Sequence, residues 1–351
     1  MSTQMNTPAK KPAGQAVLGY LKHLVTNRAI FLVLILLVVA IAIMDPTFLA
    51  YSTLRDILQQ NSTRAIIALG AGFVLITGGT DLSAGRVVGL TAVVSASMLQ
   101  VDTYAAKFFP NLPQLWVGIP IVVGIVAGLL VGCVNGFIIA KLKVPPFIAT
   151  LGTMVAVYGI NSIYFDSDPN QSQPIAGLRP DFTKIGTGSI HFGGGYTLPY
   201  IVLIAVGVGL ICWVVFNKTR LGKNMYAIGG NVQAAHVSGI NVARNLIFIY
   251  AIAGALYGLG GVLEAARTGG ATNNYGNMYE LDAIAACVVG GVSTAGGIGT
   301  VPGIMAGVLI FGVINYGLTF IGVSPYWQLI IKGLIIVAAV SFDIRKYVAK
   351  R

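Results

Sequence analysis

The chain has 351 residues, of which 56% are hydrophobic and only 9% are charged, and its mean hydropathy is +0.81. A soluble domain usually carries about 25% charged residues, so this chain has too few charges to cover a water-facing surface. The composition therefore excludes an ordinary soluble domain and predicts a polytopic membrane protein. The 45 glycines agree with this, because small residues let membrane helices approach closely.

The chain opens with a polar, basic segment over residues 1–28, and the apolar stretch "FLVLILLVVAIAIM" follows. Ala40, Ile41 and Ala42 resemble a leader-cleavage site, but the polar segment is long and many more apolar stretches follow. We therefore expect a cytoplasmic tail over 1–28 and an uncleaved first membrane span.

A membrane-spanning helix needs roughly 20 apolar residues. The sequence predicts an all-α integral membrane protein, a polytopic bundle of about ten transmembrane helices. Glycine-rich breaks close the second and eighth segments, which are the weakest of the expected spans, and we expect the bundle to contain broken or re-entrant segments. The expected spans are 29–44, 62–79, 84–101, 115–140, 147–165, 198–216, 245–264, 279–294, 300–320 and 325–343.

Lysine and arginine fix the orientation of such a bundle, because they gather in cytoplasmic loops. With the N-terminus inside, 15 of the 22 basic residues fall on the inner side, 6 on the outer side and 1, Lys332, within the last span. Both termini are thus expected in the cytoplasm. The net charge of +11 is then an orientation signal and does not indicate a nucleic-acid partner.

These spans divide the chain into a membrane domain over 29–345 and a short cytoplasmic tail over 346–351. Two loops are long enough to bind partners. The outer loop over 166–197 is rich in Pro, Gly, Asn and Asp, which indicates a structured surface loop. The inner loop over 217–244 is the second.

The stretch "LITGGTDLSAGRVVGL" lies between the second and third spans. We expect Gly78 and Gly79 to break the chain, and Asp81 or Ser83 to cap the third span at its N-terminus. Arg86 fits the inner-side charge rule. A similar sequence, "CVVGGVSTAGGIGTVPG", recurs near the end of the chain, which leaves an internal duplication open.

The inner loop contains a short predicted helix. Asn231 follows Gly230 and can cap "VQAAHVS", and Gly239 stands where a helix often ends in a left-handed residue. We expect Ala234, Ala235 and Ser238 to form a flat exposed face on which another protein could sit. On spacing alone, an ordinary solvated loop helix is the better interpretation.

The sequence shows no evident residues for nucleotide binding, metal binding or catalysis. The nucleotide-binding pattern G-x-x-x-x-G-K-[ST] comes nearest at Gly222 and Lys223, but Asn217 and Asn224 replace its first glycine and its hydroxyl residue. If ATP drives this protein, another subunit must bind it. No histidine or cysteine pair has metal-ligand spacing, and no catalytic group is visible, so we expect no metal site and no enzyme.

Polar side chains within the spans are candidates for a pathway or gate, because such groups are costly in lipid. Hydrogen bonding between helices is the more ordinary explanation for any one of them, and a plain turn is equally acceptable for the last three. The candidates are Asn61, Thr77, Asp81, Thr150, Thr153, Asn161, Glu264, Asn273, Asn274 and Tyr275.

Several separate motifs resemble one family, the permease subunits of bacterial sugar ABC importers. They are "GGTDLSAGRVVGL", "KVPPFIATLGTM", "YAIGGNVQAAHVSGINV", "GGVSTAGGIGTVPG" and "YWQLIIKGLIIVAAV". They occur in the right order over nearly the whole chain. Within the family they look most like the galactose and methyl-galactoside branch, with the ribose and xylose members as close relatives.

The resemblance implies a type II importer fold in the bacterial inner membrane. Two copies of the permease would line the pathway, a fused double ATPase or two ATPase subunits would bind ATP and Mg²⁺, and a periplasmic sugar-binding protein would deliver the sugar. The region from Asn231 to Gly239 would sit in a cleft of the ATPase and transmit its closure, with Gly230 as a further coupling residue. The cargo would be galactose, glucose or a methyl-galactoside.

Two alternatives remain open at this point. The same family could carry ribose, xylose, a nucleoside or a signalling molecule. An autonomous secondary transporter would need an intramembrane acid for a coupling ion, and Glu264 is the one well-placed acid within the spans.

Overall fold

The computed structural model describes residues 34–348, and nearly all regular structure in this range is helical. The expected cytoplasmic tail over 1–28 and residues 349–351 of the expected C-terminal tail lie outside the described residues. The helices are Leu34–Met44, η1 (Pro46–Leu49), α2 (Tyr51–Ile76), α3 (Ala84–Ser97), α4 (Gly118–Lys141), α5 (Pro146–Asp166), α6 (Pro180–Thr187), η2 (Gly193–Gly195), α7 (Tyr200–Lys218), α8 (Arg220–Gly230), α9 (Val232–Val237), α10 (Val242–Thr268), α11 (Tyr279–Val289), α12 (Val301–Phe320) and α13 (Pro325–Val348).

Among the described residues, five helices are long and apolar enough to cross a membrane, namely α4, α5, α7, α10 and α12. Each of the ten expected spans overlaps a helix, but several limits are wrong. The third helix ends at Ser97 and not at 101, the seventh ends at Thr268 and not at 264, and the tenth ends at Val348 and not at 343. The second segment starts at Tyr51 and not at 62, and the eighth ends at Val289 and not at 294. The outer loop is also not purely helical, because β1 (Ser189–Phe192) and β2 (Tyr196–Pro199) form an antiparallel hairpin within it.

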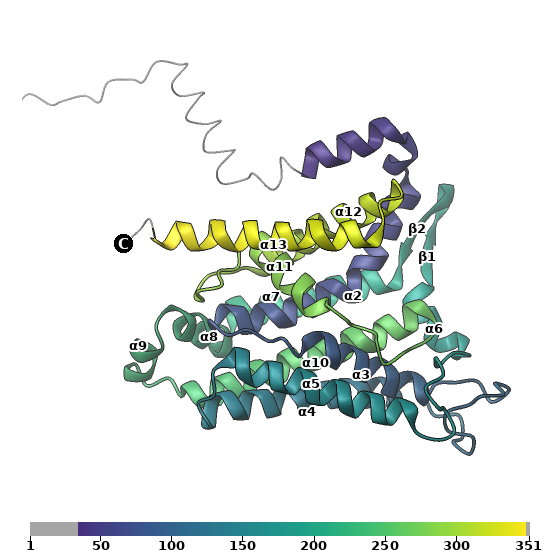
Figure 1. Cartoon of the computed structure of the whole chain (residues 1–351), viewed down its shortest axis with the longest axis horizontal. Coiled ribbons are helices and arrows are strands. Elements are labelled where there is room, and N and C mark those ends of the chain that lie inside the picture. The colour runs from purple at the N-terminus through teal and green to yellow at the C-terminus, as the bar shows by residue number, and fades with distance from the viewer. Residues whose placement is uncertain (1–33, 349–351) are drawn as a thin grey trace, which may run out of the picture.

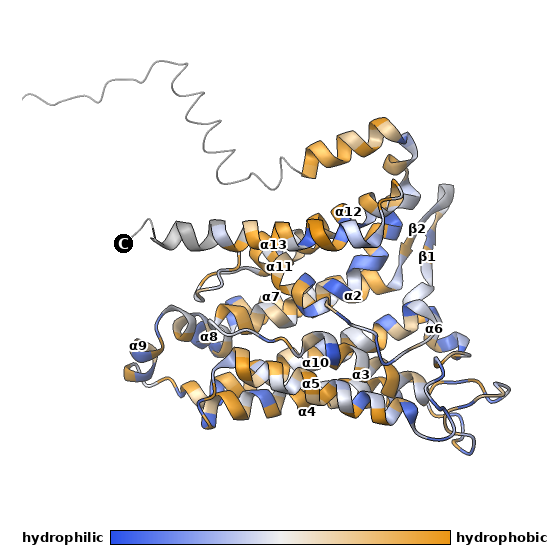
Figure 2. Ribbon diagram, viewed as in Figure 1, coloured by the Kyte–Doolittle hydropathy of each residue, from blue (hydrophilic) through white to orange (hydrophobic). Residues whose placement is uncertain are grey.

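The long helices run side by side between two ends of the molecule (Figure 1). We call the end with α6, β1 and β2 the hairpin end, and the opposite end with α8 and α9 the α9 end. Figure 2 shows hydrophobic residues along α4 and Leu34–Met44, and frequent hydrophilic residues in α6 and α8. The exposed side of α4 carries Val122, Val126, Leu130 and Phe137, an apolar stripe at helical spacing that suits contact with lipid.

Glycines hold α4 against α10 with their backbones in contact. A Cβ on Gly128 would lie 2.9 Å from the nitrogen of Gly258, and a Cβ on Gly258 would lie 2.8 Å from the carbonyl oxygen of Gly124. A Cβ on Gly254 would lie 2.9 Å from the backbone of Gly132. This spacing of four residues is the small-residue pattern that membrane helices use for close packing, and we call the contact the α4–α10 seam.

Helix α2 occupies the centre of the bundle, packed by α10, α11, α12 and α7. Its first half is polar, and it stays helical because those side chains find partners. Gln59 donates from Nε2 to the Gly186 carbonyl at 3.0 Å, and the Tyr51 hydroxyl contacts Thr197 of the hairpin. From Ala65 to Ile76 every residue is buried, so the core lies toward the α9 end of this helix.

Candidate functional site

The short helix α9 has the end signals that its sequence predicts. Asn231 is its N-cap, and the Asn231 Oδ1 accepts a hydrogen bond from the Ala234 nitrogen at 2.9 Å. Gly239 has a φ of 81°, the left-handed conformation that glycine adopts without strain. Both features confirm the expected helix between them.

The exposed face of α9 differs from the expected one. Ala235 is only 4% exposed, so the expectation that it belongs to a flat outer surface is wrong. Ala234 and Ser238 are exposed as expected, and Val232 and Val237 add 49% and 86% exposed apolar side chains. The face available to a partner is therefore Val232, Ala234, Val237 and Ser238, and Ala235 anchors it to the rest of the chain.

Helix α8 connects α9 to two breaks in the bundle. One break follows α2 at Gly78, with a φ of 77°, and the other follows α11 and includes Gly297, with a φ of 75°. The Gly297 nitrogen donates to the Ile76 carbonyl at 2.8 Å, so the two similar glycine sequences touch. Gly229 of α8 packs on the same spot, since its Cβ would lie 2.5 Å from the Gly297 nitrogen.

A side-chain hydrogen bond strengthens this contact, because the Tyr226 hydroxyl of α8 donates to the Gly299 carbonyl at 2.8 Å. We call the meeting point of residues 76–79, 229–230 and 296–299 the glycine junction. It places the segment before α9 directly on the end of α2 and on the loop that joins α11 to α12. A displacement of α8 therefore acts on three helices at once.

A groove lies beside α9, between it and the turn from α4 to α5. Its volume is about 790 Å³, and its walls include Lys143, Pro145, Gln233 and His236. A groove of this size accepts side chains of another protein. It adds a second surface to the exposed face of α9.

Asp81 does not have the expected capping role. The helix α3 begins after Ser83, whose side chain makes no cap hydrogen bond. Asp81 Oδ1 instead accepts from the Ser83 nitrogen at 2.9 Å and from the Ser83 hydroxyl at 2.6 Å, which closes a turn before the helix. Asp81 is also 3% exposed, so it lies inside the protein.

Neighbouring helices hold this turn in place. Asn135 of α4 donates to the Ser83 hydroxyl at 2.9 Å, and the Thr150 hydroxyl of α5 accepts from the Leu82 nitrogen at 3.1 Å. Thr150 is thus a structural partner of the turn. The break after α2 is a fixed element and not a free loop.

Glu264 is occupied by a network that joins three helices. It accepts from Arg267 at 2.7 Å, from the Thr63 hydroxyl of α2 at 2.8 Å and from the Tyr279 hydroxyl of α11 at 3.1 Å. Since these partners satisfy both of its oxygens, Glu264 serves as an internal cross-link. This arrangement offers no open ligand position for a coupling ion.

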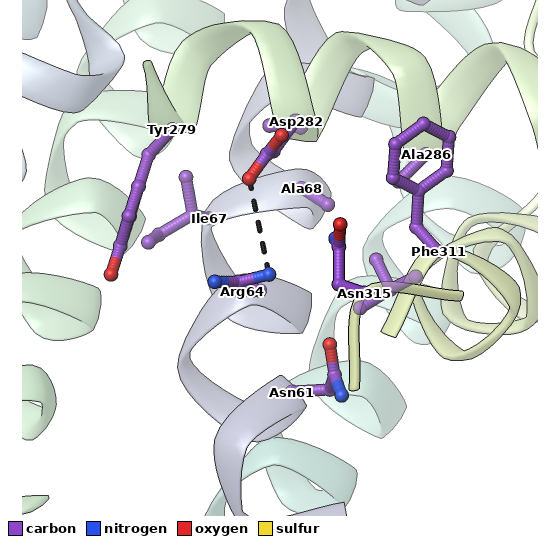
Figure 3. A pocket seen from close by; sticks show the side chains of 11 residues that line it. Asn61, Arg64, Ile67, Ala68, Tyr279, Asp282, Ala286, Phe311 and Asn315 are labelled. Carbon is purple, nitrogen blue, oxygen red and sulfur yellow. Dashed lines mark ion pairs between the residues drawn. The ribbon is translucent and has the colours of Figure 1, made fainter. Parts of the chain in front are cut away.

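A small cavity lies next to this network, between α2, α11 and α12 (Figure 3). Arg64 faces Asp282 across it at 3.9 Å, and Lys332 of α13 reaches the same carboxylate at 3.0 Å. Asn61 and Asn315 line the rest. The cavity measures about 20 Å³, which holds a single water molecule and not a sugar.

Two other candidate side chains donate hydrogen bonds to backbone carbonyls near them in the sequence. Thr77 donates to the Val74 carbonyl at 2.7 Å, and Thr153 donates to the Ala149 carbonyl at 3.0 Å. Asn61 likewise donates to the Ile57 carbonyl at 2.7 Å. Their polar groups are therefore accommodated locally, and their role in a pathway stays a prediction.

The segment after α10 meets α5 and α3. Asn161 donates to the Asn273 carbonyl at 3.3 Å, and Arg86 donates to Asn274 at 3.4 Å and to Asn277 at 2.7 Å. Tyr275 lies half-buried beside them. Counting Arg86 with the inner loops is wrong, because it binds a segment that follows the hairpin end of α10.

The sequence analysis did not predict that the fold brings Arg64 to Asp282 and Arg86 to the amide of Asn277. The charge count places Arg64 on the outer side and Arg86 on the inner side. The available signal was their position next to long apolar runs. Among residues 34–348, no group of three or more His, Cys, Asp or Glu could hold a metal ion.

A protein-family model described as branched-chain amino acid transport system / permease component matches residues 53–340. The chain belongs to this permease family. The galactose/methyl galactoside import permease protein of Haemophilus influenzae is 54% identical to it over 328 residues, which cover 93% of this chain and 97% of the relative.

The permease is also 52% identical to the protein of the same description from Escherichia coli, over 96% of this chain and 98% of that one. The ribose import permease protein of Bacillus subtilis is 39% identical, over 90% and 92%. No solved structure matches the permease. Family membership makes it an integral membrane helical protein, in agreement with the five apolar helices.

Proposed function

We propose that the permease is the membrane subunit of an ATP-driven importer that carries galactose or a methyl galactoside into the cell. The observation that carries this is the identity of 54% and 52%, over nearly the full length, to proteins described as galactose/methyl galactoside import permeases. The ribose permeases are more distant at 39% and 38%. Ribose is therefore the second candidate cargo.

In this proposal all ten apolar helical segments contribute to the membrane domain, with the domain limits given above. The α9 end faces the cytoplasm with both termini, and the hairpin end faces the periplasm. Helices α3 and α11 are short, with 14 and 11 residues, and supply the broken segments of a type II importer. The excess of basic residues at the α9 end supports this orientation.

The ATPase would dock on α9. The exposed apolar face with Val232 and Val237 and the adjacent groove form one continuous surface around it. In this role Gly230, Asn231, Ala234, Ser238 and Gly239 shape the coupling segment. Closure of the ATPase around ATP and Mg²⁺ would move α8, and the glycine junction would pass that motion to α2, α11 and α12.

The remaining partners are those that the family resemblance implies. A second copy of the permease would complete the pathway, and a fused double ATPase would serve both copies. A periplasmic sugar-binding protein would dock on the hairpin end, where α6 and the hairpin present exposed polar residues. The permease itself would bind no nucleotide and catalyse no reaction.

Co-reconstitution tests the proposal. The permease, its ATPase and its sugar-binding protein are placed in liposomes with labelled galactose and ATP. We expect uptake that requires all three proteins and ATP. Uptake by the permease alone along an ion gradient would show an autonomous secondary transporter instead, and uptake of ribose without galactose would assign the second cargo.

A further inference from the structure

Arg86 sits in an unusual setting for a charged side chain. Its guanidinium carbon lies 4.3 Å from the centre of the Tyr158 ring, which is a cation–π contact. Its Nη2 donates to Asn277 at 2.7 Å and its Nη1 donates to Asn274 at 3.4 Å. The four residues come from α3, α5 and the segment after α10, and we call them the Arg86 cluster.

The Arg86 cluster lies deep along the bundle. Tyr158 is 12 residues from the start of α5 and 8 residues from its end, which corresponds to about 18 Å and about 12 Å along the helix axis. Neither end of α5 is therefore close to the cluster. Arg86 is at the membrane depth and does not belong to a surface loop.

The segment after α10 reaches this depth without helical structure. Gly276 has a φ of 75° and packs on Gly85, where a side chain on either residue would clash with the backbone of the other. Asn273 donates to the Ser162 hydroxyl at 3.4 Å and ties the segment to α5. Irregular backbone at membrane depth is tolerated only where protein buries it or where it lines a water-filled cavity.

The exposure of the cluster decides between these two settings. Asn274 and Asn277 are exposed and Tyr158 is 39% exposed, so protein does not bury this side. Within the described range 34–348, no carboxylate forms an ion pair with Arg86. A cation and two amides facing lipid would be costly, so this side of the molecule faces water or the second copy that the proposed function requires.

We infer that Arg86, Tyr158, Asn274 and Asn277 form a sugar-contacting site within the translocation pathway. The inference rests on the proposed function and names the part of the pathway that touches the cargo. Asn274 and Asn277 use their Oδ1 atoms to accept from Arg86, so their amide N–H groups stay available. With the remaining guanidinium N–H groups they form a set of donors that matches the hydroxyl oxygens of a sugar.

The exposed Tyr158 ring supplies the other element of such a site, since it is a flat apolar surface beside polar groups. The cluster is open and its donors are few, which suits brief contact with a passing sugar. Arg86 is the residue that positions the others, because it holds both amides and the ring together.

The test uses the reconstituted importer with its ATPase and sugar-binding protein. Galactose moved per ATP hydrolysed is measured for Arg86→Ala, Arg86→Lys and Asn277→Ala. We expect Arg86→Ala to lower this ratio about tenfold or more, the effect of losing hydrogen bonds to a charged group, with normal assembly and normal stimulated ATPase rate. Arg86→Lys should recover part of the loss, because it keeps the charge without the planar fork.

A matched control is Arg55→Ala, which removes an exposed arginine whose ion pair, among residues 34–348, is with its neighbour Asp56. Its ratio should equal that of wild type. Tyr158→Phe should keep the ratio and Tyr158→Leu should lower it. A panel of monodeoxygalactoses should include one sugar for which wild type and Arg86→Ala move the same amount per ATP hydrolysed. A purely structural role of Arg86 would not produce this result.

A normal ratio in Arg86→Ala would overturn the inference. If Arg86→Ala fails to assemble, Asn277→Ala decides in its place, and a normal ratio there would overturn it. Inhibition of the wild type, but not of Arg86→Ala, by inorganic phosphate would show an anion site and also overturn it. Failure of the wild-type importer to move galactose at all would instead refute the proposed function.

Discussion

The glycine junction gives a sharp prediction through Gly229→Ala. The added Cβ would lie 1.8 Å from the Ile76 carbonyl oxygen, about half of an ordinary contact distance of ~3.5 Å. The neighbouring Gly297 nitrogen at 2.5 Å blocks a sideways shift. Helix α8 must therefore move away from α2, which strains or breaks the hydrogen bond between Gly297 and Ile76. Overpacking of this kind costs about 1–3 kcal/mol.

The adjacent Gly230→Ala is the matched control, because no heavy atom lies within 4 Å of its Cβ position. At a helical position alanine is better than glycine by up to ~1 kcal/mol, so the two variants should shift the thermal unfolding midpoint in opposite directions. The midpoint is measured on the purified permease in detergent. A second reading, galactose moved per ATP by the reconstituted importer, should fall for Gly229→Ala. Equal midpoints for the two variants would refute the reasoning that α8 rests on the glycine junction.

Three further predictions concern other parts of the chain. Val237→Asp places a charge on the most exposed apolar residue of α9; the ATPase should no longer co-purify while permease yield stays normal, and undiminished co-purification would place docking elsewhere. Asp282→Asn removes the anion between Arg64 and Lys332 and should destabilise the permease by about 1–3 kcal/mol. Adding Lys332→Met to this variant should restore part of the thermal unfolding midpoint, and no restoration would show that Asp282 and Lys332 are not coupled. The hydrogen bond from Lys107 holds the pKa of Asp102 below its ordinary 3.8. The pair therefore contributes fully to stability above pH 3.8, and this contribution is lost as the pH falls through the lower folded-state pKa. Amide hydrogen exchange in the loop over 98–117 should rise only at such acid pH, and Asp102→Asn should remove that dependence.

Local signals in the sequence were sufficient for α9. Two residues fix the ends of this helix by themselves. Asn231 caps the backbone nitrogen three residues later, and Gly239 ends the helix after two turns. The burial of Ala235 could not be predicted in this way, since it depends on which side of a six-residue helix packs on the bundle. Hydropathy predicted the five helices that are long and apolar enough to cross a membrane, because their composition is uniform over many residues.

The limits of such reasoning show most clearly at Arg86. The charge rule assumes that a break between two spans reaches the membrane surface. Here Asn135 and Thr150 hold the turn that follows α2, so the arginine after it lies half-buried among the helices and not in a surface loop. The start of α2 was not predicted for a related reason. Its polar first half carries no apolar signal, and Gln59 and Tyr51 are stabilised by contacts more than a hundred residues away.

The α4–α10 seam limits how this protein can change over evolutionary time. Any residue larger than glycine at Gly128, Gly254 or Gly258 would push two backbones apart, so a single substitution on one helix has no compensating substitution on the other. A saturation library should therefore show almost no tolerated replacements along the seam and wide tolerance on the opposite side of α4. The glycines of both helices must therefore be kept together, and substitutions that change the cargo preference would have to arise elsewhere in the bundle.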